Sequence, residues 1–184
     1  MSNDAHVRFL SELLERAADA GGRFLVGIAG VPGSGKSTLA ARWAEFGRRE
    51  FGANVMVLPM DGFHYRNDYL DAHEVECAGV LRPLRERKGS PESFDVSALM
   101  EAMRRLKAGE RLCWPTYDRV IHDPVSGKDA LPAAGVFFIE GNYLLLDEPI
   151  WRGIAALLDV RVFLDVDIEL ALGAVGERHM RGGK

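Results

Sequence analysis

Cysteine and long apolar stretches are scarce or missing in this sequence. Its two cysteines, Cys77 and Cys113, lie far apart and form no C-x-x-C pair, so we expect reduced thiols rather than a disulfide framework. No apolar run approaches the ~20 residues that a membrane-spanning helix needs. The first ten residues, MSNDAHVRFL, lack the basic-then-apolar pattern of a signal peptide. These absences predict a cytoplasmic protein that does not act in a membrane.

An excess of positive charge is missing as well. The net charge is −4 and the isoelectric point is about 5.8, so no broad basic face is expected and nucleic acid is excluded as the main partner. The chain has 184 residues, which suits a single domain with a real core, and we assign residues 1–184 to one domain. The tryptophans are scattered, which leaves the oligomeric state open; a homodimer is compatible with the sequence.

Short apolar runs alternate along the chain with stretches of helical periodicity. We expect buried strands at 24–29, 54–60, 136–139 and 160–164, and helices at 7–18, 37–49, 97–107, 150–158 and 170–178. Such alternation predicts an α/β protein with a parallel sheet covered by helices on both faces. Ligands of such folds bind at the carboxyl ends of the strands. Residues 65–93 are charged and weakly patterned, and we expect a functional loop or lid there.

The stretch GVPGSGKST, residues 30–38, fits the phosphate-loop pattern G-x-x-x-x-G-K-[ST]. It lies between an expected strand and an expected helix, which is the context that such a loop requires. Backbone N–H groups of the glycine-rich turn and the helix N-terminus would bind phosphate oxygens. Lys36 would reach the outer phosphates, and the Ser37 hydroxyl is the expected Mg²⁺ ligand. The predicted phosphate-binding residues are Gly33, Ser34, Gly35, Lys36, Ser37 and Thr38.

Acidic residues end two of the expected strands. Glu140 ends VFFIE, and the pattern fits either an acid on the Mg²⁺ side of a phosphate site or a carboxylate solvated in a loop. Asp61 follows the strand at 54–60, and it fits either a base that accepts the proton of an attacking hydroxyl or a turn cap before Gly62. His64 follows closely, as a substrate contact or as a structural histidine.

Two further segments carry polar residues that fit a substrate site. In WPTYDRVIHDP, Tyr117 and His122 fit recognition of a polar small molecule, although a surface turn would explain the same residues. A run of cations, Arg82, Arg85, Arg87 and Lys88, would ordinarily form a solvated face. Its position after Asp61 also makes an anionic substrate a hypothesis to consider.

Taken in order, these motifs resemble those of the P-loop small-molecule kinases around phosphoribulokinase, uridine kinase and type I pantothenate kinase. The resemblance covers residues 24–181 and rests on GVPGSGKST, MDGFH, RKGSPESFD, PTYDRVIHD, FIEGNYLLL and VRVFLDV. It is greatest to short pantothenate-kinase-like proteins labelled fructose transport system kinases. It implies the three-layer P-loop NTPase fold, with a substrate-side insertion at about 62–95 and a lid at about 172–184.

The resemblance also implies a reaction and roles for residues. The reaction is an ATP- and Mg²⁺-dependent transfer of phosphate to a hydroxyl of a small molecule. Asp61 matches the base, and Ser37 and Glu140 match the metal-side positions. Substrate contacts would come from Asp61, His64, Lys88, Tyr117 and His122. Lys36 and a lid arginine, Arg178 with Arg181 as a second candidate, would neutralise the transferring group.

The acceptor stays open because the motifs point to different relatives. RKGSPESFD resembles the pantothenate kinases, and PTYDRVIHD partly resembles the uridine kinases, which carry Phe-Asp where this chain has Lys88-Gly89. A sugar, a pantothenate-like acid and a nucleoside therefore remain alternatives for the acceptor. The base of the nucleotide that donates the phosphate also stays open. The family continues past its lid, so we expect further residues after Lys184. A GTPase switch is excluded because N-K-x-D is missing and no D-x-x-G follows the phosphate loop. A regulatory nucleotide-binding protein without kinase activity remains the alternative.

Overall fold

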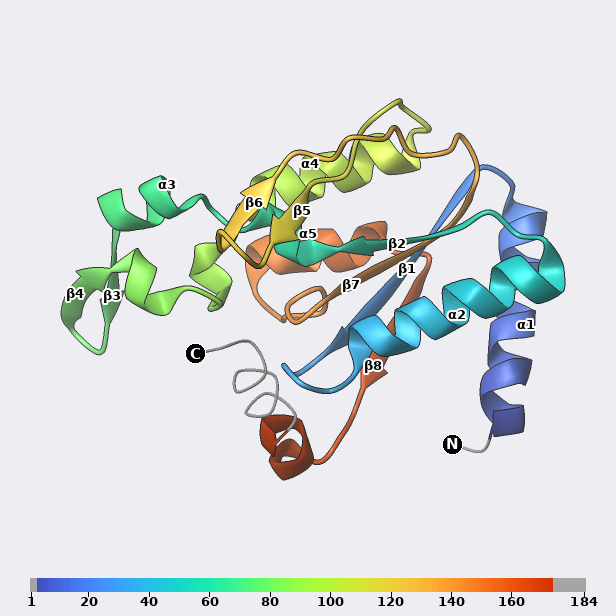
Figure 1. Ribbon diagram of the computed structural model, residues 1–184, viewed down its shortest axis with the longest axis horizontal. Helices are drawn as coiled ribbons and strands as arrows, with labels where there is room; N and C mark the ends of the chain where they lie inside the picture. Colours follow the sequence, from blue (N-terminus) through green and yellow to red (C-terminus); the bar gives the residue numbers. More distant parts are fainter. Residues whose placement is uncertain (1–2, 174–184) are drawn as a thin grey trace.

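A four-stranded parallel sheet forms the centre of the protein (Figure 1). The structure is a computed structural model that describes residues 3–173. The sheet consists of β1 (Arg23–Gly30), β2 (Val55–Pro59), β7 (Gly135–Gly141) and β8 (Val160–Leu164), in the order β2-β7-β1-β8. All three pairings are parallel. The expected parallel sheet and its four strands are therefore confirmed.

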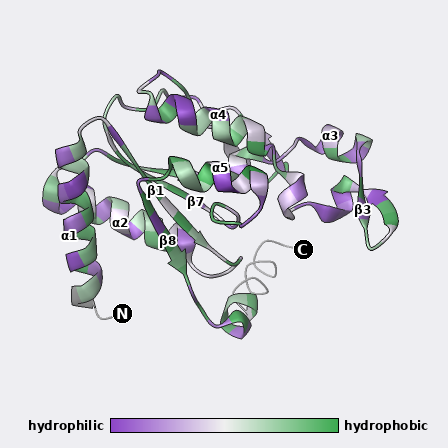
Figure 2. Cartoon of the chain, turned by 180° about the vertical axis from the view of Figure 1, so that it is seen from behind, coloured by the Kyte–Doolittle hydropathy of each residue, from purple (hydrophilic) through white to green (hydrophobic). Residues whose placement is uncertain are grey.

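Helices cover both faces of this sheet and make the fold three-layered. On one face lie α1 (Asn3–Ala20) and α2 (Lys36–Phe51), and on the other lie α4 (Val96–Lys107) and α5 (Pro149–Leu157). The helices carry hydrophilic and hydrophobic residues in turn, as expected of helices with one exposed and one buried side (Figure 2). A further helical stretch begins at residue 168 and reaches the end of the described residues.

The two central strands supply side chains to both hydrophobic cores. Phe24 and Val26 of β1 pack in the core with α1 and α2, whereas Leu25 and Ala29 pack in the core with α4 and α5. Successive side chains of a strand point to opposite faces, so a strand buried on both faces needs an unbroken apolar sequence. This is why β1 reads as a continuous apolar run.

The segment after β2 is more regular than the expected irregular loop, and that expectation was wrong. A short 3₁₀-helix (Met60–Phe63) leads to α3 (Asn67–Ala72) and to an antiparallel hairpin of β3 (Glu74–Cys77) and β4 (Val80–Pro83). Two more 3₁₀-turns, at Leu84–Arg87 and Pro91–Ser93, return the chain to α4. Ala78 and Gly79 form the hairpin turn at φ 51° and 78°, the left-handed region that a two-residue turn requires. This lobe projects from one end of the sheet (Figure 1).

A second hairpin replaces the loop expected around Tyr117. Its strands are β5 (Thr116–Asp118) and β6 (Asp123–Val125), joined by residues 119–122. The Asp118 carboxylate accepts backbone N–H groups of Val120 at 2.7 Å and Ile121 at 3.3 Å, and this local turn orders the tip. His122 has φ 54° and ends the turn. Three-residue strands are too short to show alternation, so periodicity could not reveal them.

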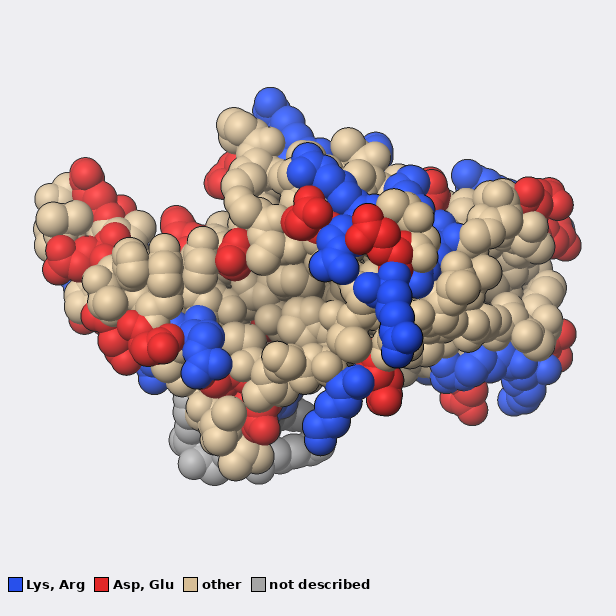
Figure 3. All heavy atoms as spheres, turned by 90° about the horizontal axis from the view of Figure 1, so that it is seen from above, with Lys and Arg blue, Asp and Glu red and all other residues tan. Residues whose placement is uncertain are grey.

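The described helices and the charges on one face of the molecule bear on whether a membrane or a nucleic acid is a partner. Over residues 3–173, every helix is too short or too polar to cross a bilayer. Seen from above, Lys and Arg atoms are interspersed with Asp and Glu atoms, and neither sign covers that face (Figure 3).

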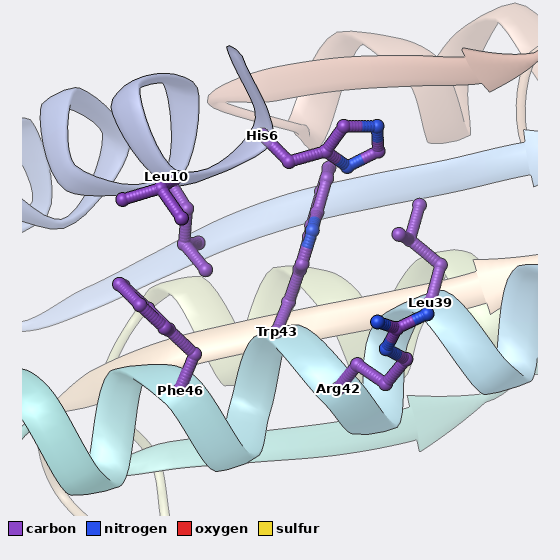
Figure 4. A pocket seen from close by; sticks show the side chains of 7 residues that line it. His6, Leu10, Leu39, Arg42, Trp43 and Phe46 are labelled. Carbon is purple, nitrogen blue, oxygen red and sulfur yellow. The ribbon is translucent and has the colours of Figure 1, made fainter. Parts of the chain in front are cut away.

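A cavity of about 370 Å³ lies between α1 and α2, where the ring of His6 packs at an angle against Trp43 (Figure 4). Its lining residues are otherwise mostly apolar.

Candidate active site

The glycine-rich loop joins β1 to α2 and leaves the start of that helix open. Gly33 and Gly35 have φ angles of 81° and 87°, in the left-handed region that glycine adopts without the penalty of a Cβ. Gly35 is the residue before the helix, and neither a side-chain cap nor an acidic residue occupies the first turn. The first turn of α2 is therefore not capped by a side chain, which is typical of helix N-termini that bind anions.

Lys36 lies over the loop rather than in solvent. Its residue is only 7% exposed, and its Nζ donates a hydrogen bond to the carbonyl oxygen of Val31 at 2.8 Å. The Ser34 hydroxyl lies 3.4 Å from the same nitrogen. The ammonium group is thus held at the mouth of the loop, where the outer phosphates of a nucleotide would bind.

The two strand-end acids lie at the same edge of the sheet. Pro59 of β2 pairs with Glu140 of β7. Asp61, two residues after Pro59, therefore lies near Glu140 at the carboxyl ends of these neighbouring strands. The Ser37 hydroxyl donates to Oε1 of Glu140 at 3.1 Å. Burial and the negative charge of Asp61 raise the pKa of Glu140, while the Ser37 hydrogen bond, Lys36 and Arg119 oppose this. A hydroxyl and a carboxylate held together fit a Mg²⁺ ion, which prefers hard oxygen ligands.

These residues line a first cavity of about 210 Å³, which we call the phosphate cavity. The predicted phosphate and metal residues on its wall are Gly33, Gly35, Lys36, Ser37, Thr38, Asp61 and Glu140. Ser34 lies beneath it, beside the Lys36 ammonium group. The structure thus brings together residues that come from the ends of three neighbouring strands.

A second cavity of about 560 Å³, which we call the acceptor cavity, adjoins the first. All five predicted substrate residues lie on its wall: Asp61, His64, Lys88, Tyr117 and His122. Asp61, Arg119, Asn142 and Pro32 line both cavities. The wall of the acceptor cavity is built by the projecting lobe and the β5–β6 hairpin, which approach each other above the strand ends.

His64 is packed into the protein rather than presented to solvent. Its Nδ1 lies 3.0 Å from the carbonyl oxygen of Asp61. The centre of its ring lies 3.8 Å from the centre of the Phe94 ring and 5.2 Å from that of the Tyr117 ring. Burial lowers the pKa of His64, and the Lys88 charge acts in the same direction. His64 therefore holds the Asp61 turn in place as well as lining the cavity.

Lys88 connects the projecting lobe to the hairpin. Its Nζ donates to Oδ1 of Asn67 at 2.5 Å and to the carbonyl oxygen of His122 at 2.6 Å. The ammonium group also lies 5.3 Å from the centre of the Tyr117 ring. This position gives Lys88 a structural part in the cavity, in addition to the predicted substrate contact.

Three residues of the shared wall were missed in the sequence: Pro32, Arg119 and Asn142. Pro32 directly precedes the predicted phosphate-binding residues. Arg119 follows Tyr117 and Asp118 within PTYDRVIHD, and Asn142 follows Glu140 and Gly141. Their neighbours in the chain were the available signal, because a residue adjoining a site residue in a tight turn tends to face the same cavity. The predicted lid residues Arg178 and Arg181 lie outside the described residues.

The sequence matches known proteins over most of its length. The sequence profile of the Phosphoribulokinase / Uridine kinase family matches residues 25–181. "Uncharacterized protein YggC" of Escherichia coli strain K12 is 40% identical over 164 residues, covering 88% of this chain and 64% of that protein. "Putative uridine kinase C227.14" of Schizosaccharomyces pombe strain 972 is 37% identical over 166 residues, covering 88% of this chain and 68% of that protein. The chain thus spans less than two thirds of the length of the Escherichia coli relative.

A solved structure shows that the likeness extends to the whole fold. It is described as a "putative fructose transport system kinase" from Silicibacter sp. TM1040 and is 35% identical in sequence. The TM-score is 0.85, and the match covers 100% of this chain and 84% of the solved one. The comparison confirms the three-layer α/β fold that the motif order implied.

Proposed function

The chain belongs to the Phosphoribulokinase / Uridine kinase family, and from this premise we propose that it transfers the γ-phosphoryl group of ATP to a hydroxyl of a small metabolite. One observation carries the proposal: Asp61 lies on the walls of both cavities. A carboxylate between a phosphate site and an acceptor site is placed to orient a hydroxyl toward the γ-phosphorus.

The phosphate cavity has the groups that hold a triphosphate. The open N-terminus of α2 and the loop amides bind phosphate oxygens, and the Lys36 ammonium group neutralises the outer ones. Ser37 and Glu140 would hold Mg²⁺, which supplies charge neutralisation to the phosphate oxygens when bound.

In the proposed reaction, the acceptor's hydroxyl oxygen forms a bond to the γ-phosphorus while the bond from that phosphorus to the bridging oxygen breaks. ADP leaves with the bridging oxygen, and the hydroxyl proton passes to the Asp61 carboxylate. The protein's own contribution is mainly position and charge, since phosphoryl transfer requires little covalent chemistry from side chains. Arg178 of the expected lid would add positive charge during transfer.

The acceptor cavity supports a small-molecule acceptor rather than a macromolecule. Its volume of about 560 Å³ is that of a typical metabolite site. We assign the lobe at about 62–95 to the acceptor side, because His64, Arg85 and Lys88 reach the cavity from it. A cytoplasmic site of action fits the cysteines, since Cys77 and Cys113 are both unbridged.

The direct test is release of ADP from Mg²⁺-ATP, measured alone and with sugars, sugar phosphates, nucleosides, pantothenate and hydroxy acids. We expect one acceptor class to stimulate release well above the hydrolysis seen without acceptor. Tight binding of ATP without stimulation by any compound would instead support a regulatory nucleotide-binding protein.

Asp61→Asn separates the proposed base from a general effect on folding. We expect the substitution to lower acceptor-stimulated ADP release by about 10²–10⁴-fold, because the amide cannot accept the hydroxyl proton. ATP affinity should change little. The matched control is Asp129→Asn, at an exposed position outside both cavities. An equal loss of ATP affinity and of rate would contradict the assignment of Asp61 as the base.

A further inference from the structure

The charges on the acceptor cavity are not balanced. Its wall carries three cationic side chains, Arg85, Lys88 and Arg119, whereas Asp61 is the one carboxylate among the described residues that line it. The protein as a whole has a net charge of −4, so this concentration of positive charge does not follow from composition. Charge of one sign lining a concave site raises the local concentration of ligands of the opposite sign.

Arg119 has its hydrogen-bonding capacity available. Within residues 3–173 its guanidinium makes neither a hydrogen bond nor an ion pair, and the residue is exposed at the tip of the β5–β6 hairpin. It nevertheless lines both cavities. A guanidinium presents five donors in a planar fork that matches a carboxylate or a phosphate.

Within residues 3–173, the Arg85 guanidinium has one partner, Asp71, in a weak ion pair. Its Nη1 lies 3.5 Å from Oδ2 of Asp71, and the two side chains are 41% and 62% exposed. Exposed pairs of this kind contribute little to stability, so a ligand anion can replace Asp71 at little cost. Arg85 can therefore turn its donors to a bound molecule.

Lys88 and His64 also affect the charge of the acceptor cavity, because both lie on its wall. The Lys88 ammonium group is fixed by Asn67 and His122, so its charge stays at the cavity wall without having to move. The lowered pKa of His64 favours a neutral ring, which does not add to the positive charge. The cationic character of the cavity thus rests on two adaptable arginines and one fixed lysine.

We propose that the acceptor is a small hydroxylated anion, with a carboxylate or a phosphate ester bound by Arg85 and Arg119 while its hydroxyl lies at Asp61. This inference rests on the proposed kinase function and names its substrate class. A neutral polyol of the same size would displace water from the three cations without compensating their charge, which costs binding free energy. The anionic group therefore supplies both affinity and orientation.

The test compares matched pairs of compounds that differ in charge. Glycerate is paired with glycerol, pantothenate with pantothenol, and fructose 6-phosphate with fructose. The first two pairs test a carboxylate, and the third tests a phosphate ester. Isothermal titration with Mg²⁺-ADP present measures binding, and ADP release from Mg²⁺-ATP measures transfer. We expect at least one anion to bind at least 10-fold more tightly than its neutral partner and to stimulate ADP release.

Variants locate the effect in this cavity. Arg119→Gln and Arg85→Gln should each weaken binding of the preferred anion about 10- to 100-fold, the range expected when a charged hydrogen-bonding partner is lost. Binding of the neutral partner should stay unchanged. Arg8→Gln, an exposed substitution on α1 outside the cavity, is the matched control and should leave both affinities unchanged.

The outcomes separate this inference from the kinase proposal. Equal binding and transfer for neutral and charged partners would overturn the anionic acceptor and leave the kinase intact. Selective anion binding without ADP release from any compound would overturn the kinase and retain the anion selectivity of the cavity. Anions that bind no more tightly than their neutral partners, or that bind equally well to both arginine variants, would overturn the inference.

Discussion

At the scale of single residues, His64 connects pH to stability. Its ring is packed against Phe94, and burial together with the charge of Lys88 lowers its pKa below the usual value of 6.5. The folded protein therefore binds a proton at this site less readily than the unfolded chain does. As the pH falls below 6.5, protonation favours the unfolded chain, and this loss of stability continues until the pH reaches the lowered pKa of the folded state.

We expect His64→Asn to remove part of the acid sensitivity of the protein. Asparagine places an N–H donor near the position of Nδ1, so the contact to the Asp61 carbonyl can be kept while the titration is lost. The measurement is the melting temperature of both proteins between pH 8 and pH 5, with the variant showing the flatter profile. His73→Asn is the matched control, because His73 also contacts a backbone carbonyl through Nδ1 but is exposed. Parallel profiles for the wild type and His64→Asn would rule out His64 as the source.

Individual site residues differ in how well the sequence could predict them. Lys36 and Ser37 could be located because the spacing of a phosphate loop is fixed by the backbone geometry that binds phosphate. Glu140 could be located because a carboxylate at the end of an apolar strand must face a polar site. Arg119 was harder to locate, because its place on both cavities depends on where a short hairpin folds back. Its neighbours Tyr117 and Asp118 in the chain were the one signal that pointed to it.

At the scale of elements, the β5–β6 hairpin depends on a glycine in another segment. A Cβ on Gly62 would lie 2.2 Å from the carbonyl oxygen of Pro115 and 2.8 Å from the backbone nitrogen of Thr116. The backbone at the start of β5 thus packs directly on the 3₁₀-turn that carries Asp61. This contact sets the distance between Asp61 and the hairpin that carries Tyr117 and Arg119.

Gly62→Ala should displace the hairpin and lower stability by roughly 1–3 kcal/mol, the usual cost of overpacking a close contact. We expect acceptor affinity to fall more than ATP affinity, because the hairpin builds the acceptor cavity and most of the phosphate loop lies elsewhere. Urea unfolding and the two binding constants provide the measurement. Gly79→Ala is not suitable because its φ is positive, so Gly173→Ala is the control: within residues 3–173, nothing lies within 4 Å of a Cβ there. An unchanged acceptor affinity in Gly62→Ala would show that this contact does not position the hairpin.

The elements of the sheet and those of the lobe were not equally predictable. β1 and β7 are buried on both faces, so their unbroken apolar sequences identify them. β3 and β4 pack against little else and carry mostly exposed side chains, so no core imposes a pattern on them. The turn at Ala78 also uses a residue that rarely adopts positive φ, which conceals the hairpin signal.

At the scale of the whole molecule, the fold places the site where the parallel strands end. β1, β2 and β7 deliver the phosphate loop, Asp61 and Glu140 to one edge, and the lobe and the hairpin close the acceptor side. The order of motifs along the chain predicts this convergence, since parallel strands share a carboxyl edge. The chemical identity of the acceptor depends instead on side chains that meet across long sequence separations, which a linear pattern does not reveal.

Because ligand binding to a folded site stabilises the whole protein, nucleotide binding can be measured through global unfolding. At an ATP concentration 100 times the dissociation constant, Mg²⁺-ATP should stabilise the folded state by about 2.7 kcal/mol, which corresponds to a melting-temperature increase of roughly 5–10 °C for a chain of this size. Lys36→Ala should remove most of that increase, since the ammonium group at the mouth of the loop is lost.

The comparison must be made within each variant, with and without nucleotide. Lys36 also donates to Val31 in the ligand-free protein, so the substitution alters the starting melting temperature as well. Lys128→Ala, at an exposed position outside both cavities, should keep the full increase. If Lys36→Ala kept the full increase too, Lys36 would not bind the outer phosphates, and its assignment to the phosphate site would be wrong.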